Sequence, residues 1–168
     1  EPVVETRERE DGALVYELEP APVPFPESTP EELRARIEAS LARMLDFALR
    51  PKENAAAQDE LVAIGATALP ALLSALYELP LVTDVDAMRV NLVNQCLEEI
   101  TGLSMGFSPQ IQEGSGVGTT SELRASAIRR WFAWWHQEGA AFEGPAAPVD
   151  LLDGSLAPAP ASKAPAQR

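Results

Sequence analysis

The stretch Leu61–Leu76, LVAIGATALPALLSAL, holds two apolar segments around a short break. Its large apolar residues recur at spacings of three and four, the period of one helix face. Gly65 suits the left-handed end of a first helix, and Thr67 suits the cap of a second. Pro70 falls in the first turn of that second helix, where a missing N–H does no harm. So short a link predicts two antiparallel helices in contact.

Upstream of this stretch, a longer apolar stripe predicts another helix. Thr29 suits its N-cap, Pro30 its first position, and Glu32 completes a T-x-x-E capping box. The dipeptide Arg50-Pro51 ends it, because the residue before proline avoids the helical region. The stripe consists of Leu33, Ile37, Leu41, Met44, Leu45 and Leu49.

The helix that ends at Gly65 is expected to begin near residue 53, and two further helices are expected over residues 84–102 and 119–139. The first of these two carries the stripe Val85, Met88, Leu92, Val93, Cys96, Leu97 and Ile100, and the second again opens on a T-x-x-E box. The glycine-rich stretch 102–119 between them is longer than most loops of compact domains, which marks it as functional or mobile.

Both ends of the chain differ from this helical middle. Residues 3–18 alternate like a strand pair around Asp11-Gly12, a dipeptide typical of tight hairpins. Prolines at positions 20, 22, 24, 26 and 30 then favour an extended connector. Residues 140–168 hold 9 alanines and 5 prolines and are expected to be disordered. The expected organisation is an arm with hairpin and linker (1–29), a helical domain (30–139) and a tail (140–168).

Composition excludes several classes of partner. The 168 residues hold 13 basic and 26 acidic side chains, a net charge of −13, and most of the excess lies in residues 1–100. Such a balance argues against binding nucleic acid or anionic lipid, which needs clustered Lys and Arg. No run approaches the ~18 unbroken apolar residues of a membrane span, so direct membrane insertion is not expected. A single cysteine cannot form an intramolecular disulfide.

The central sequence resembles the HEAT-repeat family. Residues 61–76 are similar to the family's pattern in which L-x-x-I/L-G ends one helix and A-L/V-P-x-L-x-x-A-L forms the next. Met88-Arg89-Val90-Asn91 and Leu97–Gly102 resemble the following repeat, and Arg130–Trp135 resembles the closing repeat of many bacterial members. The resemblance covers roughly residues 54–139 and implies an all-α, short α-solenoid of about five helices.

The chain departs from the family pattern in three places. The turn before residue 84 lacks the usual Asp-rich sequence, and the loop 103–118 is long where repeats turn tightly. Residues 91–95 are more polar than the alanine-rich norm. The physical logic of stacking still holds, because each helix pair has an apolar face that it cannot cover alone.

Residues that could support catalysis are few and scattered. Cys96 lies within an apolar stripe and is interpreted as a small core hydrophobe. His136, the only histidine, has no recognisable nucleophile or acid beside it in the sequence. The stretch 114–120 lacks the lysine of a phosphate-binding loop, and no zinc or calcium motif occurs. Adjacent acids on a helix point about 100° apart and cannot converge on one atom. No catalytic, cofactor-binding or metal-binding residue is therefore predicted.

A protein-binding surface is the remaining expectation. Trp131, Trp134 and Trp135 are interpreted as core, and the alternative keeps one edge of the last helix, at Trp135 or Phe132, exposed as an anchor for a partner. Met105 and Phe107 are expected to fold back over the helices. The candidate binding residues are Tyr77, Phe107, Arg129, Phe132, Trp135 and His136.

The resemblance implies a non-catalytic scaffold or accessory subunit of a larger assembly, with one or more protein partners. An extended arm could add a strand to a partner's sheet. Two alternatives stay open. One is a HEAT-like lyase, or another enzyme acting on a protein partner, with a pocket near Tyr77, Arg129 and His136. The other is a structural module of a longer chain, because the sequence starts at Glu1 rather than methionine. That start and the acidity slightly favour the cell envelope over the cytoplasm.

Overall fold

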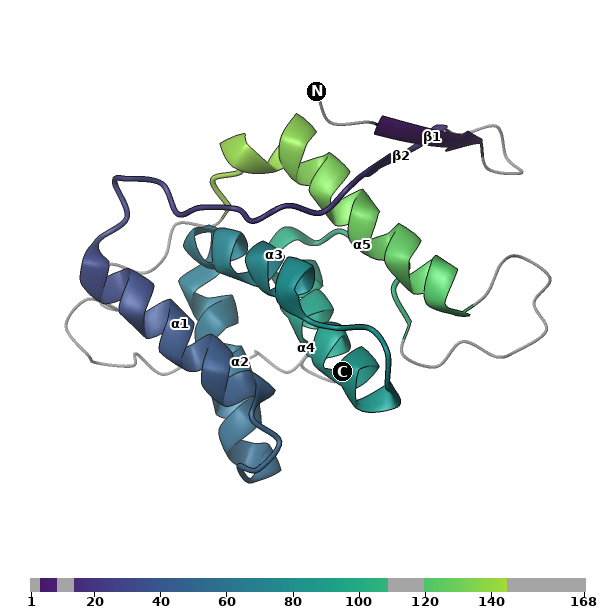
Figure 1. Cartoon of the computed structure of the whole chain (residues 1–168). Coiled ribbons are helices and arrows are strands. Elements are labelled where there is room, and N and C mark those ends of the chain that lie inside the picture. Colours follow the sequence, from purple (N-terminus) through teal and green to yellow (C-terminus); the bar gives the residue numbers. More distant parts are fainter. Residues whose placement is uncertain (1–3, 9–13, 109–119, 145–168) are drawn as a thin grey trace, which may run out of the picture.

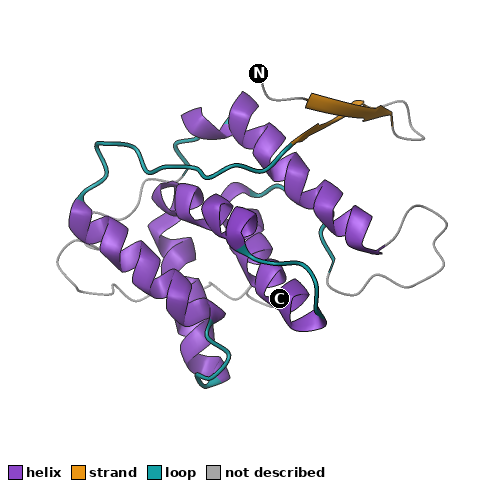
Figure 2. Ribbon diagram, in the orientation of Figure 1, coloured by secondary structure: helices purple, strands orange, loops and turns teal. Residues whose placement is uncertain are grey.

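A computed structural model describes residues 4–8, 14–108 and 120–144. The described chain is mostly helical, which confirms the all-α class (Figures 1 and 2). The predicted tail beyond residue 144, the Asp11-Gly12 turn and most of the glycine-rich stretch lie outside the described residues. In chain order the elements are β1 (Val4–Glu8), β2 (Leu14–Leu18), α1 (Glu31–Leu45), α2 (Pro51–Ile64), the 3₁₀ turn η1 (Gly65–Ala68), α3 (Leu69–Glu78), α4 (Asp84–Thr101), α5 (Thr120–Gln137) and the 3₁₀ turn η2 (Gly139–Ala141).

The helices enclose one apolar core. Helix α1 packs on α2 and α3 packs on α4, and Figure 1 shows α3 and α4 between the first pair and α5. Trp131 of α5 is completely buried, and its indole N–H donates to Oδ1 of Asn94 on α4 at 2.8 Å. A buried indole needs such a partner, so this bond fixes α5 on the core. Other fully buried core residues are Ile37, Met44, Leu61, Leu69, Leu72, Leu73, Val90, Val93 and Leu97.

The break between α2 and α3 differs in detail from the prediction. Gly65 adopts φ 73° and ψ −139°, a conformation essentially limited to glycine, and η1 follows it. Thr67 lies inside η1 and caps nothing, whereas Pro70 occupies the first turn of α3 as predicted. The closest helical neighbour of α2 is α1 rather than α3, and α3 meets α2 through η1. Buried Ser40 and Ala57 explain this, because small side chains let two helix axes approach.

Helix α1 ends at Leu45, four residues before the predicted end at Leu49. The Asp46 carboxylate accepts the Ala48 N–H at 2.9 Å, a local bond that replaces the next helical turn. The side-chain amide of Asn54 donates to the carbonyls of Arg43 and Asp46, both at 2.8 Å. Asn54 of α2 thus caps carbonyl groups at the end of α1 that have no partner within the helix. Residues 46–50 form the loop between the two helices.

The cap of α1 also departs from the predicted box. Thr29 is buried but makes no side-chain cap to α1, and its carbonyl instead accepts Nε of Arg34 at 3.0 Å. The unpredicted box is at α4, where Thr83 accepts the Asp86 N–H at 3.1 Å and Asp86 accepts the Thr83 N–H at 2.8 Å. Hydrogen bonds from the backbone N–H and the hydroxyl of Thr83 to the Asp86 carboxylate lower the pKa of Asp86.

The N-terminal arm runs across the helices before α1 begins. Strand β1 pairs antiparallel with β2, and β2 packs on α5. Residues 19–30 then form a strap that crosses from α5 to the start of α1 (Figure 1). At its middle, Val23 donates its N–H to Oγ of Ser74 at 2.9 Å, and its carbonyl accepts that hydroxyl at 3.0 Å. The strap is thus fixed to α3 by a reciprocal pair of bonds.

One described stretch, Pro51–Glu78, is long and apolar enough to cross a membrane by length and composition. It consists of α2, η1 and α3, and 61% of its most apolar window is buried inside the protein. A buried core helix passes the same test. Leu61, Leu69, Leu72 and Leu73 of this stretch are fully buried, so it forms part of the core.

Candidate functional site: a groove between two helices

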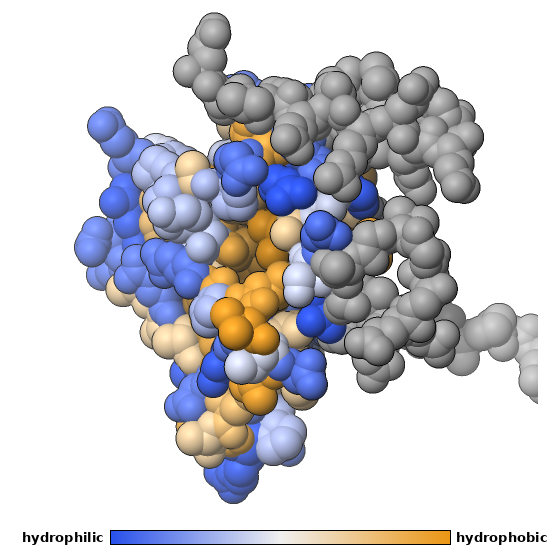
Figure 3. Space-filling model, turned by 45° about the vertical axis from the view of Figure 1, so that its right-hand side comes forward, coloured by the Kyte–Doolittle hydropathy of each residue, from blue (hydrophilic) through white to orange (hydrophobic). Residues whose placement is uncertain are grey.

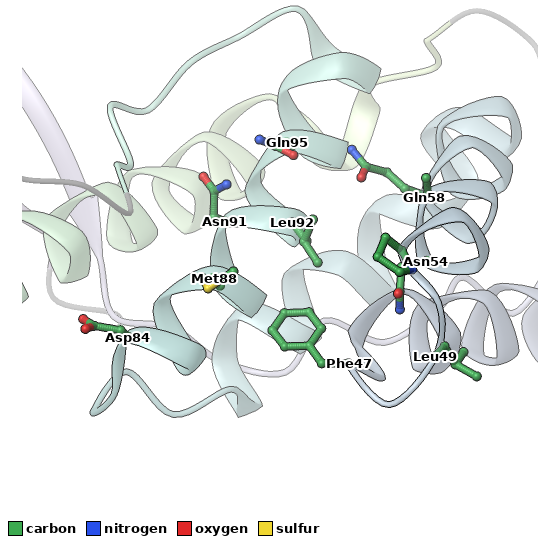
Figure 4. A pocket seen from close by; sticks show the side chains of 11 residues that line it. Phe47, Leu49, Asn54, Gln58, Asp84, Met88, Asn91, Leu92 and Gln95 are labelled. Carbon is green, nitrogen blue, oxygen red and sulfur yellow. The ribbon is translucent and has the colours of Figure 1, made fainter.

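A groove of about 760 Å³ lies between α2 and α4. Figure 4 shows its two helical walls and the α1–α2 loop that closes one end. The lining residues are Phe47, Leu49, Pro51, Asn54, Ala55, Gln58, Asp84, Met88, Asn91, Leu92 and Gln95.

Helical periodicity places these side chains in two rows. On α4 the lining positions 84, 88, 91 with its neighbour 92, and 95 recur every three or four residues, so they share one face. On α2 the positions 51, 54, 55 and 58 do the same. The opposite face of α4 carries the core residues Val90, Val93 and Leu97. Helix α4 therefore has one face in the core and another in the groove.

Large apolar side chains are exposed in this groove. Met88 is 54% exposed and Phe47 is 39% exposed, and Leu92 lies half-buried on the floor between them and Gln58 (Figure 4). Phe47 is held in place by Arg89, whose guanidinium lies 5.1 Å from the ring centroid. Apolar residues also form a stripe between hydrophilic regions on the face shown in Figure 3. Exposed apolar surface that is concave and rimmed by polar groups is typical of binding sites.

Four carboxamides line the same groove. The Asn54 amide is committed to the end of α1, and Nε2 of Gln58 donates to Oε1 of Glu99 at a long 3.5 Å. Asn91 and Gln95 form no side-chain hydrogen bond with any described residue. Figure 4 shows the amides of Gln58 and Gln95 approaching one another from opposite walls. Each free carboxamide offers two donors and an acceptor to an occupant.

The charged residues on the two wall helices of the groove are mostly acidic. Helices α2 and α4 together carry seven acidic and two basic residues, a net charge of −5. Asp84 lines the groove, and Glu99 lies one helical turn beyond Gln95 on the same row. Neither carboxylate forms an ion pair with another described residue. The electrostatic potential along the α4 wall therefore favours a cationic occupant.

A second cavity of about 380 Å³ lies between the strap, η1 and the end of α5. Trp135, half-buried, forms part of its wall together with Pro26, Leu33, Pro70 and Phe142. Neither this cavity nor the groove is lined by Tyr77, Arg129 or His136, the residues near which the alternative of an enzyme would require a pocket.

The predicted binding residues do not form one surface. Phe132 is 3% exposed, so the prediction of an exposed anchor is wrong for this residue, because its side of α5 faces the core. Phe107 and Trp135 pack against the core while half-buried, which matches the predicted folding back of Phe107. Tyr77 is 48% exposed on α3, and His136 is exposed at the end of α5.

The sixth predicted residue, Arg129, belongs to a buried polar cluster. Glu17 on β2 is 1% exposed, and its carboxylate accepts Nε of Arg129 at 2.8 Å and the hydroxyl of Ser126. Arg130 donates to the same hydroxyl at 3.1 Å and to the carbonyl of Met105 at 3.0 Å. A buried carboxylate needs this many donors, and the cluster connects the arm to α5.

Cys96 is a core residue. Its thiol lies 3.5 Å from the Met44 sulfur, and burial raises its pKa to about 12. A thiol with so high a pKa is not a nucleophile near neutral pH. Among residues 4–8, 14–108 and 120–144, no three His, Cys, Asp or Glu side chains are grouped as metal ligands.

The groove was not predicted from the sequence, although the sequence contains two signals for it. Met88 and Leu92 were assigned to a single core stripe, whereas they belong to a second apolar face of α4. The polar run 91–95, which departs from the alanine-rich family norm, supplies two of the carboxamides. Comparison with known proteins finds no matching family model, no matching curated protein and no matching solved structure.

Proposed function

We propose that the chain is a non-catalytic protein-interaction module, acting as a scaffold or accessory subunit of a larger assembly. The proposed architecture is a short HEAT-like α-solenoid of five helices. Its support is a contact pattern in which each helix touches the helix two places further along the chain, α1 with α3, α2 with α4 and α3 with α5. Stacked helix pairs produce this pattern.

The groove between α2 and α4 is the observation that carries the proposal. Its exposed apolar residues, Phe47 and Met88, have no described partner segment over them, and its carboxamides match the polar groups of a polypeptide. A partner that covered this surface would remove apolar area from water, at about 25 cal/mol per Å². Binding of a protein segment would both bury the exposed apolar side chains and pair the carboxamides with polar groups.

An enzyme acting on a protein partner is the main alternative. It would need convergent polar groups in a cavity. Around Arg129 the polar groups bond to one another and connect β2 to α5. The groove offers carboxamides and apolar side chains, which suit recognition better than proton transfer.

The experiment compares two substitutions on α4 that differ only in whether they face the groove. Met88→Asp places a charge in the groove, and Val85→Asp places one at an exposed apolar position, 46% accessible, outside it. Tagged full-length chains are used to capture partners from an extract of the source organism. A captured protein is then purified, and its affinity for each chain is measured directly.

We expect Met88→Asp to weaken the purified partner's binding by at least about tenfold, because an unpaired carboxylate would be buried in an apolar contact. Val85→Asp should bind like the unmodified chain. Circular dichroism checks that both variants are folded. Equal affinity of all three chains would show that the groove is not the binding surface.

A further inference from the structure

We propose that the α2–α4 groove binds an extended, basic segment of a partner protein, with apolar side chains at alternate positions entering the groove. This inference rests on the proposed function and adds the chemistry and conformation of the partner. It follows from three properties of the groove: the spacing of its carboxamides, the position of its apolar floor, and the sign of its charge.

The carboxamide spacing favours an extended backbone. Asn91 and Gln95 are four residues apart on α4, a rise of about 6 Å. Two residues of an extended chain span about 6.6 Å, so both carboxamides can pair with backbone groups of the same strand-like segment. In a helical occupant, the backbone N–H and C=O groups are already hydrogen-bonded to one another. The side-chain amides of Asn91 and Gln95 would therefore form few hydrogen bonds with a helix.

The apolar floor fits the side-chain alternation of an extended segment. Met88 and Leu92 lie between the carboxamide row and the opposite wall, and Phe47 closes the end (Figure 4). Successive side chains of an extended chain point to opposite sides, so every second one would enter the groove. From Asp84 to Gln95 the α4 wall rises about 16 Å, which corresponds to about five extended residues.

Charge selects a basic segment. Asp84 and Glu99 mark the two ends of the α4 row, about 22 Å apart along the helix, or about seven extended residues. Basic side chains flanking the apolar positions would meet these two carboxylates. With a net charge of −5 on the two wall helices, an acidic segment would be repelled.

Two other occupants are disfavoured by the same charges. A second copy of the chain would bring another net charge of −13 to an acidic surface. The chain's own residues 145–168 include Leu151 and Leu152, but Asp150 and Asp153 flank them. Both alternatives are tested below as outcomes that would overturn the proposal.

The probe is the peptide KLSVSLSR, which has apolar residues at alternate positions and a basic residue at each end. It is titrated into the full-length ¹⁵N-labelled protein, and binding is followed by the side-chain amide signals of Asn91 and Gln95. We expect these signals to move and the affinity to fall as salt is added. The acidic counterpart ELSVSLSE should bind at least about tenfold more weakly.

Two substitutions test the groove carboxamides while nearly preserving side-chain size, and a third is the control. Asn91→Leu and Gln95→Met should each weaken peptide binding about fivefold, because each removes hydrogen bonds to the peptide backbone. Gln137→Met, at an exposed position at the end of α5, is the matched control and should leave binding unchanged. The probe methylated at its backbone nitrogens should bind more weakly to the unmodified chain and lose most of its sensitivity to Asn91→Leu and Gln95→Met.

Several results would overturn this inference without touching the proposed function. One is equal affinity for the acidic and basic peptides, and another is unchanged peptide affinity in both Asn91→Leu and Gln95→Met. A third is that the basic peptide does not bind, while a captured partner still binds Met88→Asp more weakly than Val85→Asp. Tighter probe binding by a full-length Leu152→Asp variant would identify the tail as the occupant. Self-association that Met88→Asp abolishes would identify a second copy.

Discussion

Glu17 is a carboxylate with no solvent-exposed side-chain surface, and its ion pair with Arg129 joins β2 to α5. Removing the arginine would leave the Glu17 carboxylate buried with fewer hydrogen-bond donors. Such an uncompensated buried charge strongly destabilises the folded state. We expect Arg129→Met to lower the free energy of unfolding by about 3 kcal/mol, measured by urea denaturation.

The matched control for this pair is Arg50, which pairs with Glu53 on the surface. Its side chain is 83% exposed, and Arg50→Met should change the free energy of unfolding by less than about 1 kcal/mol. The double variant Glu17→Leu with Arg129→Met should recover part of the loss, because no charge remains buried. If Arg129→Met is no more destabilising than Arg50→Met, the carboxylate of Glu17 is satisfied without its partner.

Cys96 predicts a pH dependence through its buried thiol. Its pKa is raised from 9.0 to about 12, so between these values the folded state keeps a proton that the unfolded chain releases. The free energy of unfolding should therefore fall more steeply with rising pH in the unmodified chain than in Cys96→Ala. Denaturation series from pH 8 to 10.5 compare the two slopes. Parallel slopes would mean that the thiol titrates normally in the folded protein.

Cys96 and Glu17 show which roles of single residues can be predicted from the sequence. A lone cysteine four residues from Leu92 is predicted as a core hydrophobe, and it is buried. The role of Glu17 could not be predicted, because its partners are more than a hundred residues away in the chain. Burial of a charge depends on donors that only the folded chain brings together.

Between elements, the contact of α1 with α2 includes a polar bridge. Glu60 accepts Nε of Arg36 and Oγ of Ser40, both at 2.6 Å. Burial acts to raise the pKa of Glu60, but these two donors outweigh it, and the pKa is lowered. A carboxyl with a lowered pKa stabilises the fold above its unfolded pKa near 4.5 and loses this contribution as the pH falls.

We therefore expect Glu60→Gln to cost about 1 kcal/mol at pH 7, since the bonded side chains are partly exposed. The difference from the unmodified chain should shrink as the pH falls below about 4.5, because protonation removes the same charge. Urea denaturation at pH 7, 5, 4 and 3.5 measures it. Glu38→Gln, an exposed position on α1, is the control and should differ little at any pH. A constant difference across this range would contradict the assignment.

Element boundaries show where local pattern is sufficient and where it is not. The end of α2 at Gly65 and the position of Pro70 follow from conformational limits of single residues, and they were predicted. The end of α1 was not, because Leu49 continues the apolar spacing. It is set instead by the Asp46 carboxylate and by Asn54, which reaches back from α2. At the end of α1, the hydrogen bonds of these two side chains therefore outweigh the helical spacing of the apolar residues.

At the scale of the whole molecule, the groove exists only because α2 and α4 come together. Periodicity predicted one apolar face on α4 that included both Val93 and Met88, yet Val93 lies in the core and Met88 lies in the groove. Distinguishing them requires knowing which helix covers which face. The all-α class needed only periodicity and caps, whereas the site needed the packing order of the helices.

The strap that crosses the helices gives the last prediction. One end is fixed where Glu17 of β2 pairs with Arg129 of α5, and the other where Nη2 of Arg34 donates to the Pro26 carbonyl at 2.9 Å. Between these ends, Ser74 hydrogen-bonds the strap to α3. Ser74→Ala removes both bonds to Val23 and should destabilise the fold by about 1–2 kcal/mol. It should also speed hydrogen exchange of the Val23 amide at least about fivefold. Ser28→Ala, at an exposed position of the strap, should change neither. Unchanged exchange at Val23 in Ser74→Ala would mean that the two ends alone hold the strap on α3.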